Sequence, residues 1–193
     1  MQNQEPIKKG YAILTQKQYI LRQKSSIMEF LITEDGSQTI MDQKSGEHLH
    51  TKSGAYEEAL EKHVKPLKIE DGMSILDYCF GIGYNSFVAM SLHKDLTIEA
   101  IEYNADYIKV IPTLTCPQIQ YLLDQSKQLQ IKPELTDKNN NHLKVHIDTI
   151  ENILPTLKDN SFDRVFFDPF SPKTQPELWS EELFKHIFRV LKP

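Results

Sequence analysis

A short stretch with two glycines, "LDYCFGIGYN", has residue types suited to holding a cofactor. Gly81 and Gly83 follow a β-prone run and precede a helical one, and glycine at such a turn lets a ligand approach the backbone at a helix N-terminus. The stretch differs from the GxGxxG fingerprint because Cys79 stands at the first glycine position. Asp77 would repel a pyrophosphate, so a cofactor with a cationic or neutral group fits better. We expect Asp77, Gly81, Gly83 and Asn85 to contact a cofactor, the alternative being a tight turn without a ligand.

Two further acids stand at the ends of predicted strands. Glu102 follows Gly83 by nineteen residues, and a carboxylate at that place can accept hydrogen bonds from both hydroxyls of a ribose. Asp148 follows "LKVHI" and is placed to receive an adenine amino group. The alternatives are a solvated loop residue for Glu102 and a helix N-cap for Asp148.

The stretch "VFFDPFSPKTQPELW" ends a fourth predicted strand with an acid and two prolines. Proline fixes the backbone direction, so Pro169 and Pro172 would present Asp168 and the Phe170 ring rigidly. Open α/β sheets bind their ligands at the carboxyl edge, where this stretch would lie. We expect Asp168 and Phe170 to be catalytic and Asp168 also to lie beside the cofactor. A purely structural proline-rich turn is the alternative.

The order of the predicted elements explains how these residues would meet. From residue 74 onward β-prone stretches alternate with helical ones, which predicts βαβ units and a parallel sheet. The expected strands are "SILDYC", "LTIEAIE", "LKVHI" and "RVFFD". The expected helices begin near residues 84 and 104 and include "IENILPTL" and "EELFKHIFRVL", and "ELTDKNNNH" is expected to be a polar loop.

The region before residue 55 has a different pattern. "IMEFLITEDGSQTIMD" places an Asp-Gly pair between two β-prone stretches, which predicts a hairpin, and "GEHLHT" predicts a third short strand. "SGAYEEALEKHVKPL" predicts a helix with Ser53 as its N-cap. We therefore expect a small β-rich N-terminal lobe over residues 1–54 and a Rossmann-like α/β domain over residues 55–193. The chain stops at "VLKP", where another strand would begin, so C-terminal strands are expected to be missing.

Composition narrows the possible classes of protein. The 193 residues are 39% hydrophobic and 25% charged, which is ordinary usage for a soluble chain. No apolar run approaches the roughly 18 residues of a membrane span, and the first residues lack a signal peptide, so we expect a cytoplasmic protein without a membrane partner. Two cysteines are too few for a disulfide framework. The histidines lack a convincing spacing for metal ligands, so no metal is expected.

Charge is unevenly distributed along the chain. The net charge is −5, yet residues 1–28 contain five bases and one acid. This basic segment, from Lys8 to Lys24, has Tyr11 and Tyr19 interleaved and is suited to following a nucleic-acid backbone. A solvated terminal segment is the alternative. The sequence does not indicate an oligomeric state.

These residues together resemble a class I S-adenosylmethionine-dependent methyltransferase, and more narrowly the MnmC-type tRNA wobble-uridine methyltransferase domain. The narrow resemblance depends on "DGSQTIMDQKSGEHLHTKSGAYEEALEKHV", "LDYCFGIGYN" and "FDRVFFDPFSPKTQPELWSEELFKHI". The resemblance implies S-adenosyl-L-methionine as cofactor and tRNA as substrate, methylated on the exocyclic aminomethyl nitrogen of the wobble uridine.

The resemblance also implies roles for individual residues. Gly81 and Gly83 would line the methionine part of the cofactor, Glu102 would hold the ribose and Asp148 the adenine. Asp168 would lie beside the reacting amine. The loop "SGEHLHTKSGA" would close over the cofactor, and its expected participants are Glu47, His48 and Ser53.

The chain departs from the family pattern at two places, and two other functions stay open. Cys79 replaces the usual first glycine, and "DPF" stands where the family more often has Asp-Gly-Phe. No oxidase half is present, so the chain would perform only the methyl step. One alternative is an aminopropyltransferase acting on decarboxylated S-adenosylmethionine. The other is a non-catalytic RNA-binding protein on a methyltransferase fold.

Overall fold

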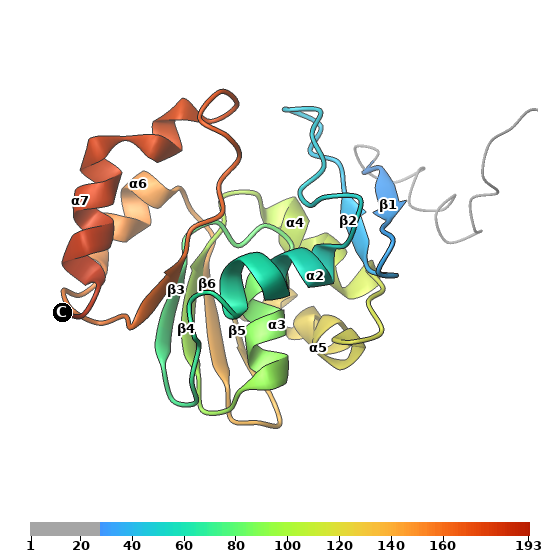
Figure 1. Ribbon diagram of the computed structural model, residues 1–193, viewed down its shortest axis with the longest axis horizontal. Helices are drawn as coiled ribbons and strands as arrows, with labels where there is room; N and C mark the ends of the chain where they lie inside the picture. The colour runs from blue at the N-terminus through green and yellow to red at the C-terminus, as the bar shows by residue number, and fades with distance from the viewer. Residues whose placement is uncertain (1–27) are drawn as a thin grey trace, which may run out of the picture.

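The computed structural model describes residues 28–193 and shows a mixed α/β sheet with helices on both faces (Figure 1). The predicted basic segment from Lys8 to Lys24 lies outside the described residues. A five-stranded sheet has the order β5-β6-β4-β3-β7. Its strands are β3 (Ser74–Asp77), β4 (Thr97–Ile101), β5 (Glu134–Thr136), β6 (His142–His146) and β7 (Arg164–Phe166).

The sheet topology places the carboxyl ends of four parallel strands along one edge of the sheet. Strands β6, β4, β3 and β7 are parallel, with Ile75 paired to Ile98 on one side and Leu76 paired to Val165 on the other. The chain runs from β3 outward to β4 and β6 and then returns to the opposite side of β3 as β7. The strand order therefore reverses at β3, which is where open α/β sheets bind their ligands. The predicted Rossmann-like sheet is confirmed.

Alternation along β3 separates two hydrophobic cores. Ile75 packs into one cluster and its neighbour Leu76 into the other, because successive side chains of a strand point to opposite faces. The first cluster is covered by α2 (Ala55–Ala59), α3 (Tyr84–Leu92), α4 (Ala105–Val110) and α5 (Gln120–Gln125), and the second by α6 (Ile150–Ile153) and α7 (Glu181–Val190). Figure 1 shows α6 and α7 together on one side of the sheet.

Short helical turns extend several of these helices. The π-helical turn η1 (Leu60–Val64) continues α2, and the remaining four are 3-10 turns. They are η2 (Ile111–Thr113), η3 (Ser126–Gln130), η4 (Leu154–Thr156) and η5 (Pro176–Trp179). Turn η5 lies in the connection from β7 to α7, so it belongs to the segment that carries Asp168.

The predicted hairpin is confirmed, and it caps α2. Strands β1 (Phe30–Ile32) and β2 (Gln38–Ile40) pair antiparallel around the predicted Asp-Gly turn, where Gly36 has φ +82°. The Ser37 hydroxyl accepts a hydrogen bond from the Ala55 amide, and Asp35 accepts one from the Glu57 amide. The prediction that Ser53 is the N-cap is wrong. Gly54 is the N-cap, and the hairpin supplies the acceptors that a capping side chain would otherwise provide.

Two other local predictions are wrong. The stretch "GEHLHT" forms no strand, and only an isolated bridge joins Met41 to His48. The expected polar loop contains β5, which pairs antiparallel with β6 at the edge of the sheet. Leu135 is the one buried residue of this strand, and a single apolar position is too little alternation to reveal a strand in the sequence.

The domain boundary near residue 54 stays a prediction. Ile40 of the hairpin packs in the same core as α3.

Candidate functional site

A cavity of about 320 Å³ opens at the carboxyl edge of the sheet. Its walls come from the segments that follow β3, β4, β6 and β7 and from the segment between the hairpin and α2. Six of the predicted site residues line it, namely Gly81, Asn85, Glu102, Asp148, Asp168 and Phe170. Five others do not line it, namely Glu47, His48, Ser53, Asp77 and Gly83. The topology thus brings together residues from four strand ends.

The glycine turn needs both of its glycines. Gly81 has φ +57°, and a Cβ there would lie 3.2 Å from Leu49 Cδ2 on the cavity wall. Gly83 has φ +86°, and a Cβ there would lie 2.6 Å from a ring carbon of Phe87 and 2.8 Å from one of Phe80. Gly83 is also the N-cap of α3. Gly81 therefore leaves open backbone beside the cavity, whereas Gly83 allows α3 to pack closely.

Glu102 is tied to the glycine turn. Its Oε2 accepts a 2.8 Å hydrogen bond from the Gly81 amide, and its Oε1 accepts one of 2.8 Å from the Asn104 amide. The side chain is only 5% exposed. Burial raises the pKa of Glu102 to about 7, although the backbone hydrogen bonds favour the carboxylate. Glu102 is therefore a buried acid that can change its charge near neutral pH.

Asp168 presents a carboxylate to the cavity from just beyond β7. Asn85 Nδ2 donates a 3.1 Å hydrogen bond to Asp168 Oδ2, and His63 Nε2 lies 3.4 Å from the same oxygen. Burial opposes ionisation, but the hydrogen bonds and the charge of His63 outweigh it, so the pKa of Asp168 is lowered. The side chain is 37% exposed. Asp168 is thus an ionised carboxylate that is held on one oxygen and accessible from the cavity.

Asp77 is buried rather than exposed to the cavity. Its side chain is fully buried at the end of β3, where Oδ2 accepts a 2.7 Å hydrogen bond from the Ser86 hydroxyl. Oδ1 has no hydrogen-bond partner within residues 28–193. Burial raises the pKa of Asp77 to about 7, with the nearby Asp168 and Glu102 adding to the shift and His63 opposing it. The predicted contact between Asp77 and a cofactor has no counterpart in the cavity wall.

Asp148 and Phe170 line the cavity from the segments that follow β6 and β7. Asp148 Oδ1 accepts hydrogen bonds from the Thr149 amide and from Asn152 Nδ2. Thr149, not Asp148, is the N-cap of α6. The Phe170 carbonyl accepts a 2.8 Å hydrogen bond from Trp179 Nε1, which fixes the proline-rich segment after β7.

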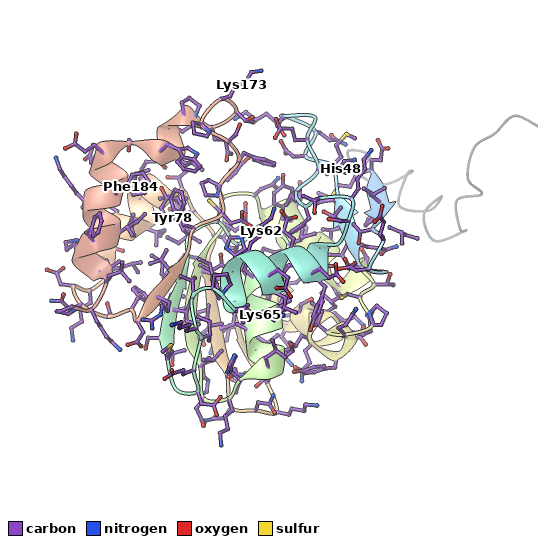
Figure 2. The ribbon with its side chains drawn as sticks, in the orientation of Figure 1. His48, Lys62, Lys65, Tyr78, Lys173 and Phe184 are labelled. Atoms are coloured by element: carbon purple, nitrogen blue, oxygen red, sulfur yellow. The ribbon has the colours of Figure 1, made fainter. Side chains whose placement is uncertain are left out.

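An aromatic cluster beneath α7 supports that segment. Phe167 contacts three other aromatic rings, with centroid distances of 4.9 Å to Tyr78, 4.9 Å to Trp179 and 5.2 Å to Phe184. Figure 2 labels Phe184 on α7, Tyr78 on the side facing the sheet, and Lys173 at the outer tip of the loop after β7. Packing of the aromatic cluster therefore holds both ends of the segment that carries Asp168 and Phe170.

The segment predicted to close over the cofactor follows the hairpin and meets the loop after β7. Glu47 accepts a 2.9 Å hydrogen bond from the Thr174 hydroxyl, which joins the two segments at the molecular surface. Ser53 is exposed and its hydroxyl contacts that of Thr51. Asp42 accepts a 2.7 Å hydrogen bond from the buried Tyr107 hydroxyl, which anchors the start of this segment on α4.

Several cavity residues were not expected from the sequence. Lys44, Leu49 and His50 come from the segment after the hairpin, and Tyr103 follows Glu102. His50 Nδ1 lies 2.9 Å from the Thr39 hydroxyl, and burial lowers the pKa of His50. His63 lies four residues beyond the buried Ala59 in the predicted helix, so the sequence alone could place it on the same helix face. Its proximity to Asp168 depends on tertiary packing.

Residues 28–193 contain neither a membrane-spanning helix nor a cluster of metal-binding side chains. No helix among them has the length and apolar character needed to cross a membrane. Nor do these residues include a cluster of three or more histidine, cysteine, aspartate or glutamate side chains able to hold a metal ion.

Comparison with known proteins gives consistent matches. A family described as S-adenosyl-L-methionine-dependent methyltransferase matches residues 113–193. Two uncharacterised proteins of Methanocaldococcus jannaschii, MJ0670 and MJ1233, are 29% and 30% identical over 168 and 138 residues. These alignments cover 83% and 72% of this chain but 46% and 41% of those proteins, so the chain spans less than half the length of these relatives.

Among solved structures, MnmC2 from Aquifex aeolicus superimposes with a TM-score of 0.72 at 27% identity, over 93% of this chain and 65% of that one. A spermidine synthase in complex with a transition-state analogue superimposes with a TM-score of 0.55 over 81% of this chain and 51% of that one. Its 14% identity shows a shared fold alone.

Proposed function

Because the chain carries an S-adenosylmethionine-dependent methyltransferase domain of the MnmC type, we propose that it methylates the exocyclic aminomethyl nitrogen of the wobble uridine in tRNA. The observation that carries this proposal is the placement of Asp168, an ionised carboxylate at the carboxyl end of β7 that faces the cavity. The proposal includes the division into an N-terminal lobe, residues 1–54, and a methyltransferase domain, residues 55–193.

The cavity residues fit the cofactor. Gly81 leaves backbone open where a Cβ would meet Leu49, and Glu102 offers a carboxylate at the end of β4 for the ribose hydroxyls. Ile101, Tyr103 and Ile150 line the cavity and would form an apolar and aromatic wall for the adenine, and Asp148 would accept a hydrogen bond from its amino group. When bound, S-adenosylmethionine supplies an electrophilic methyl group on a sulfonium. Asp77 is buried at the end of β3 and Gly83 lets α3 pack closely after the glycine turn. Glu47 and Ser53 belong to the segment that would close over the cofactor.

Asp168 has two roles in the proposed reaction. An amine attacks a methyl group only through a neutral nitrogen whose lone pair is aligned with the breaking bond. The Asp168 carboxylate accepts an N–H hydrogen bond that orients this lone pair, and its negative charge stabilises the cation that develops on nitrogen. Phe170, fixed by Trp179 through its carbonyl, provides an apolar surface that excludes water from the acceptor.

Aminopropyl transfer is a weaker proposal. It would use decarboxylated S-adenosylmethionine and the same fold, but the spermidine synthase match shows only that fold. The matched family is described as a methyltransferase. A non-catalytic RNA-binding role would leave the pairing of Asp168 with His63 and Asn85 without a chemical purpose.

The test uses tRNA that carries an aminomethyl group on its wobble uridine. The protein is incubated with this tRNA and labelled S-adenosylmethionine, and the nucleosides are analysed by mass spectrometry. We expect label on the aminomethyl nitrogen and none on matched tRNA that lacks the aminomethyl group. Decarboxylated S-adenosylmethionine in a parallel reaction tests aminopropyl transfer. Label at another nucleoside, or no label, would contradict the proposed acceptor.

A further inference from the structure

His63 occupies an unusual backbone position next to the cavity. It lies on the π-helical turn η1, where the Lys65 amide donates a 3.0 Å hydrogen bond to the Leu60 carbonyl. Single π-helical turns occur frequently at functional sites. The ring is only 11% exposed and meets the Phe166 ring edge-on, with centroids 6.3 Å apart. His63 is therefore a buried imidazole at the end of β7, and it does not line the cavity itself.

The contacts of His63 and Asn85 with Asp168 involve one carboxylate oxygen. Asn85 Nδ2 and His63 Nε2 lie 3.1 Å and 3.4 Å from Oδ2. Among residues 28–193, no hydrogen bond reaches Oδ1 of Asp168. The two contacts come from different elements, α3 and η1, so they fix the plane of the carboxylate and leave its second oxygen available to the cavity.

Charged and titratable groups surround His63 on several elements. Asp168 and the buried Asp77 lie at the ends of β7 and β3, Glu58 lies on α2, and His50 lies on the cavity wall. Burial disfavours the imidazolium, but the hydrogen bond and charge of Asp168 outweigh it, so the pKa of His63 is raised. The charge of Asp77 also raises the pKa of His63.

We propose that His63 is a positioning residue for methyl transfer, which holds Asp168 by Oδ2 so that Oδ1 is free to accept a hydrogen bond from the acceptor amine. This inference rests on the proposed function. It assigns His63 no contact with either substrate, and its effect should appear in the rate of transfer rather than in cofactor affinity.

The kinetic test compares three variants in single turnovers at saturating S-adenosylmethionine and aminomethyl-uridine tRNA. His63→Leu fills the space without a donor and should lower the rate by roughly 10- to 100-fold, since a misplacement of about 1 Å can cost 100-fold. His63→Gln retains an N–H donor and should recover most of the rate. His142→Leu is the matched control, because His142 is exposed and its ring contacts the exposed Thr136 hydroxyl. Calorimetry should show the same cofactor Kd for all of them.

A second measurement needs no acceptor. The imidazole signals of His63 are titrated by NMR in the unaltered chain and in Asp168→Asn. Loss of the negative charge should lower the pKa of His63. Circular dichroism checks that each variant is folded.

The outcomes separate this inference from the proposed function. An unaltered protein that methylates no tRNA overturns the proposed acceptor, whatever the variants do. An active protein in which His63→Leu and His63→Gln react equally fast overturns the positioning role alone. A pKa of His63 that does not respond to Asp168→Asn also overturns it.

Discussion

The Gly81 amide donates a hydrogen bond of 2.8 Å to Glu102 Oε2, which joins the turn after β3 to the end of β4. The two residues are 21 positions apart on the chain, but they lie beyond the ends of neighbouring strands, because β3 and β4 are paired in parallel. The contact means that the same carboxylate both supports the glycine turn and lines the cavity. Cofactor binding and the conformation of the turn should therefore depend on the charge of Glu102.

Glu102→Gln should weaken the binding of S-adenosylmethionine by about 10- to 100-fold, because hydrogen bonds to a charged group contribute about 1.5–3 kcal/mol each. The pKa of Glu102 is about 7, and ribose hydroxyls donate better to the carboxylate than to the neutral acid. The unaltered chain should thus bind more weakly at pH 6 than at pH 8, and the Gln variant should lose this dependence. Isothermal titration calorimetry measures both.

The matched control for Glu102 is Glu99→Gln on the same strand, where Glu99 pairs with His146 at 2.7 Å. It should leave the cofactor Kd unchanged. An unchanged Kd for Glu102→Gln as well would show that the ribose lies elsewhere in the cavity.

Gly83→Ala should destabilise the fold by roughly 1–3 kcal/mol, since overpacking in a core and the left-handed backbone at φ +86° add together. The new Cβ would meet Phe87 and Phe80 below 3 Å. Gly72→Ala is the control, because Gly72 has φ +80° but open space around it. Urea unfolding measures the loss of stability in both variants. The extra loss in Gly83→Ala is the cost of the clash, because both variants share the strain of a positive φ. Equal losses for both would mean that Phe80 and Phe87 move aside freely.

The carboxyl-edge residues were predictable because each follows a recognisable strand. Gly81, Glu102, Asp148 and Asp168 stand where apolar β-prone runs end, and parallel strands bring such ends together. His63 was not predictable, because its approach to Asp168 depends on how η1 packs against the end of β7.

The start of α2 shows a similar limit. The sequence next to the helix contains Ser53, a good capping residue, but the acceptors come from Asp35 and Ser37 in the hairpin. The local sequence could not reveal that hairpin side chains accept these hydrogen bonds in place of Ser53. The hairpin reaches the helix only because Ile40 packs into the core.

Asp77→Asn should raise the free energy of unfolding at pH 8 more than at pH 5. Burial raises the folded-state pKa of Asp77 from 3.8 to about 7, so the folded chain retains a proton that the unfolded chain releases between about pH 4 and 7. Stability falls as pH rises through this window, and the full loss, of the order of a few kcal/mol, is present above pH 7. Asparagine cannot ionise and avoids that loss.

The measurement for Asp77 is urea unfolding at both pH values. Asp106→Asn on the exposed start of α4 is the control and should show no such difference between pH 5 and pH 8. A stability difference for Asp77→Asn that is the same at pH 5 and pH 8 would contradict the raised pKa.

The basic segment from Lys8 to Lys24 should contribute to tRNA affinity and leave cofactor affinity unchanged. Replacing its five bases by glutamine should flatten the dependence of the logarithm of tRNA affinity on the logarithm of salt concentration, because fewer counterions are released on binding. Filter binding over a series of salt concentrations measures the slope. The control variant neutralises five exposed lysines that do not line the cavity, namely Lys68, Lys94, Lys127, Lys144 and Lys158. An equal slope with and without the segment's charges would contradict its role.

Asp168→Ala should lower the rate of methyl transfer more than any other single change in the cavity while sparing cofactor affinity. Loss of one preorganised electrostatic partner costs about 2.7–4 kcal/mol in the transition state. Asp168→Asn keeps an oxygen that accepts the amine N–H but loses the charge that stabilises the developing cation, so it should retain partial activity. Single turnovers at saturating cofactor and tRNA give both rates, with Asp106→Asn as a control carboxylate. Because the pKa of Asp168 is lowered, the unaltered chain keeps this carboxylate ionised well below neutral pH. The loss of rate on acidification should therefore follow protonation of the acceptor amine and of Glu102. An alanine variant as fast as the unaltered chain would reduce Asp168 to a structural residue of the turn after β7.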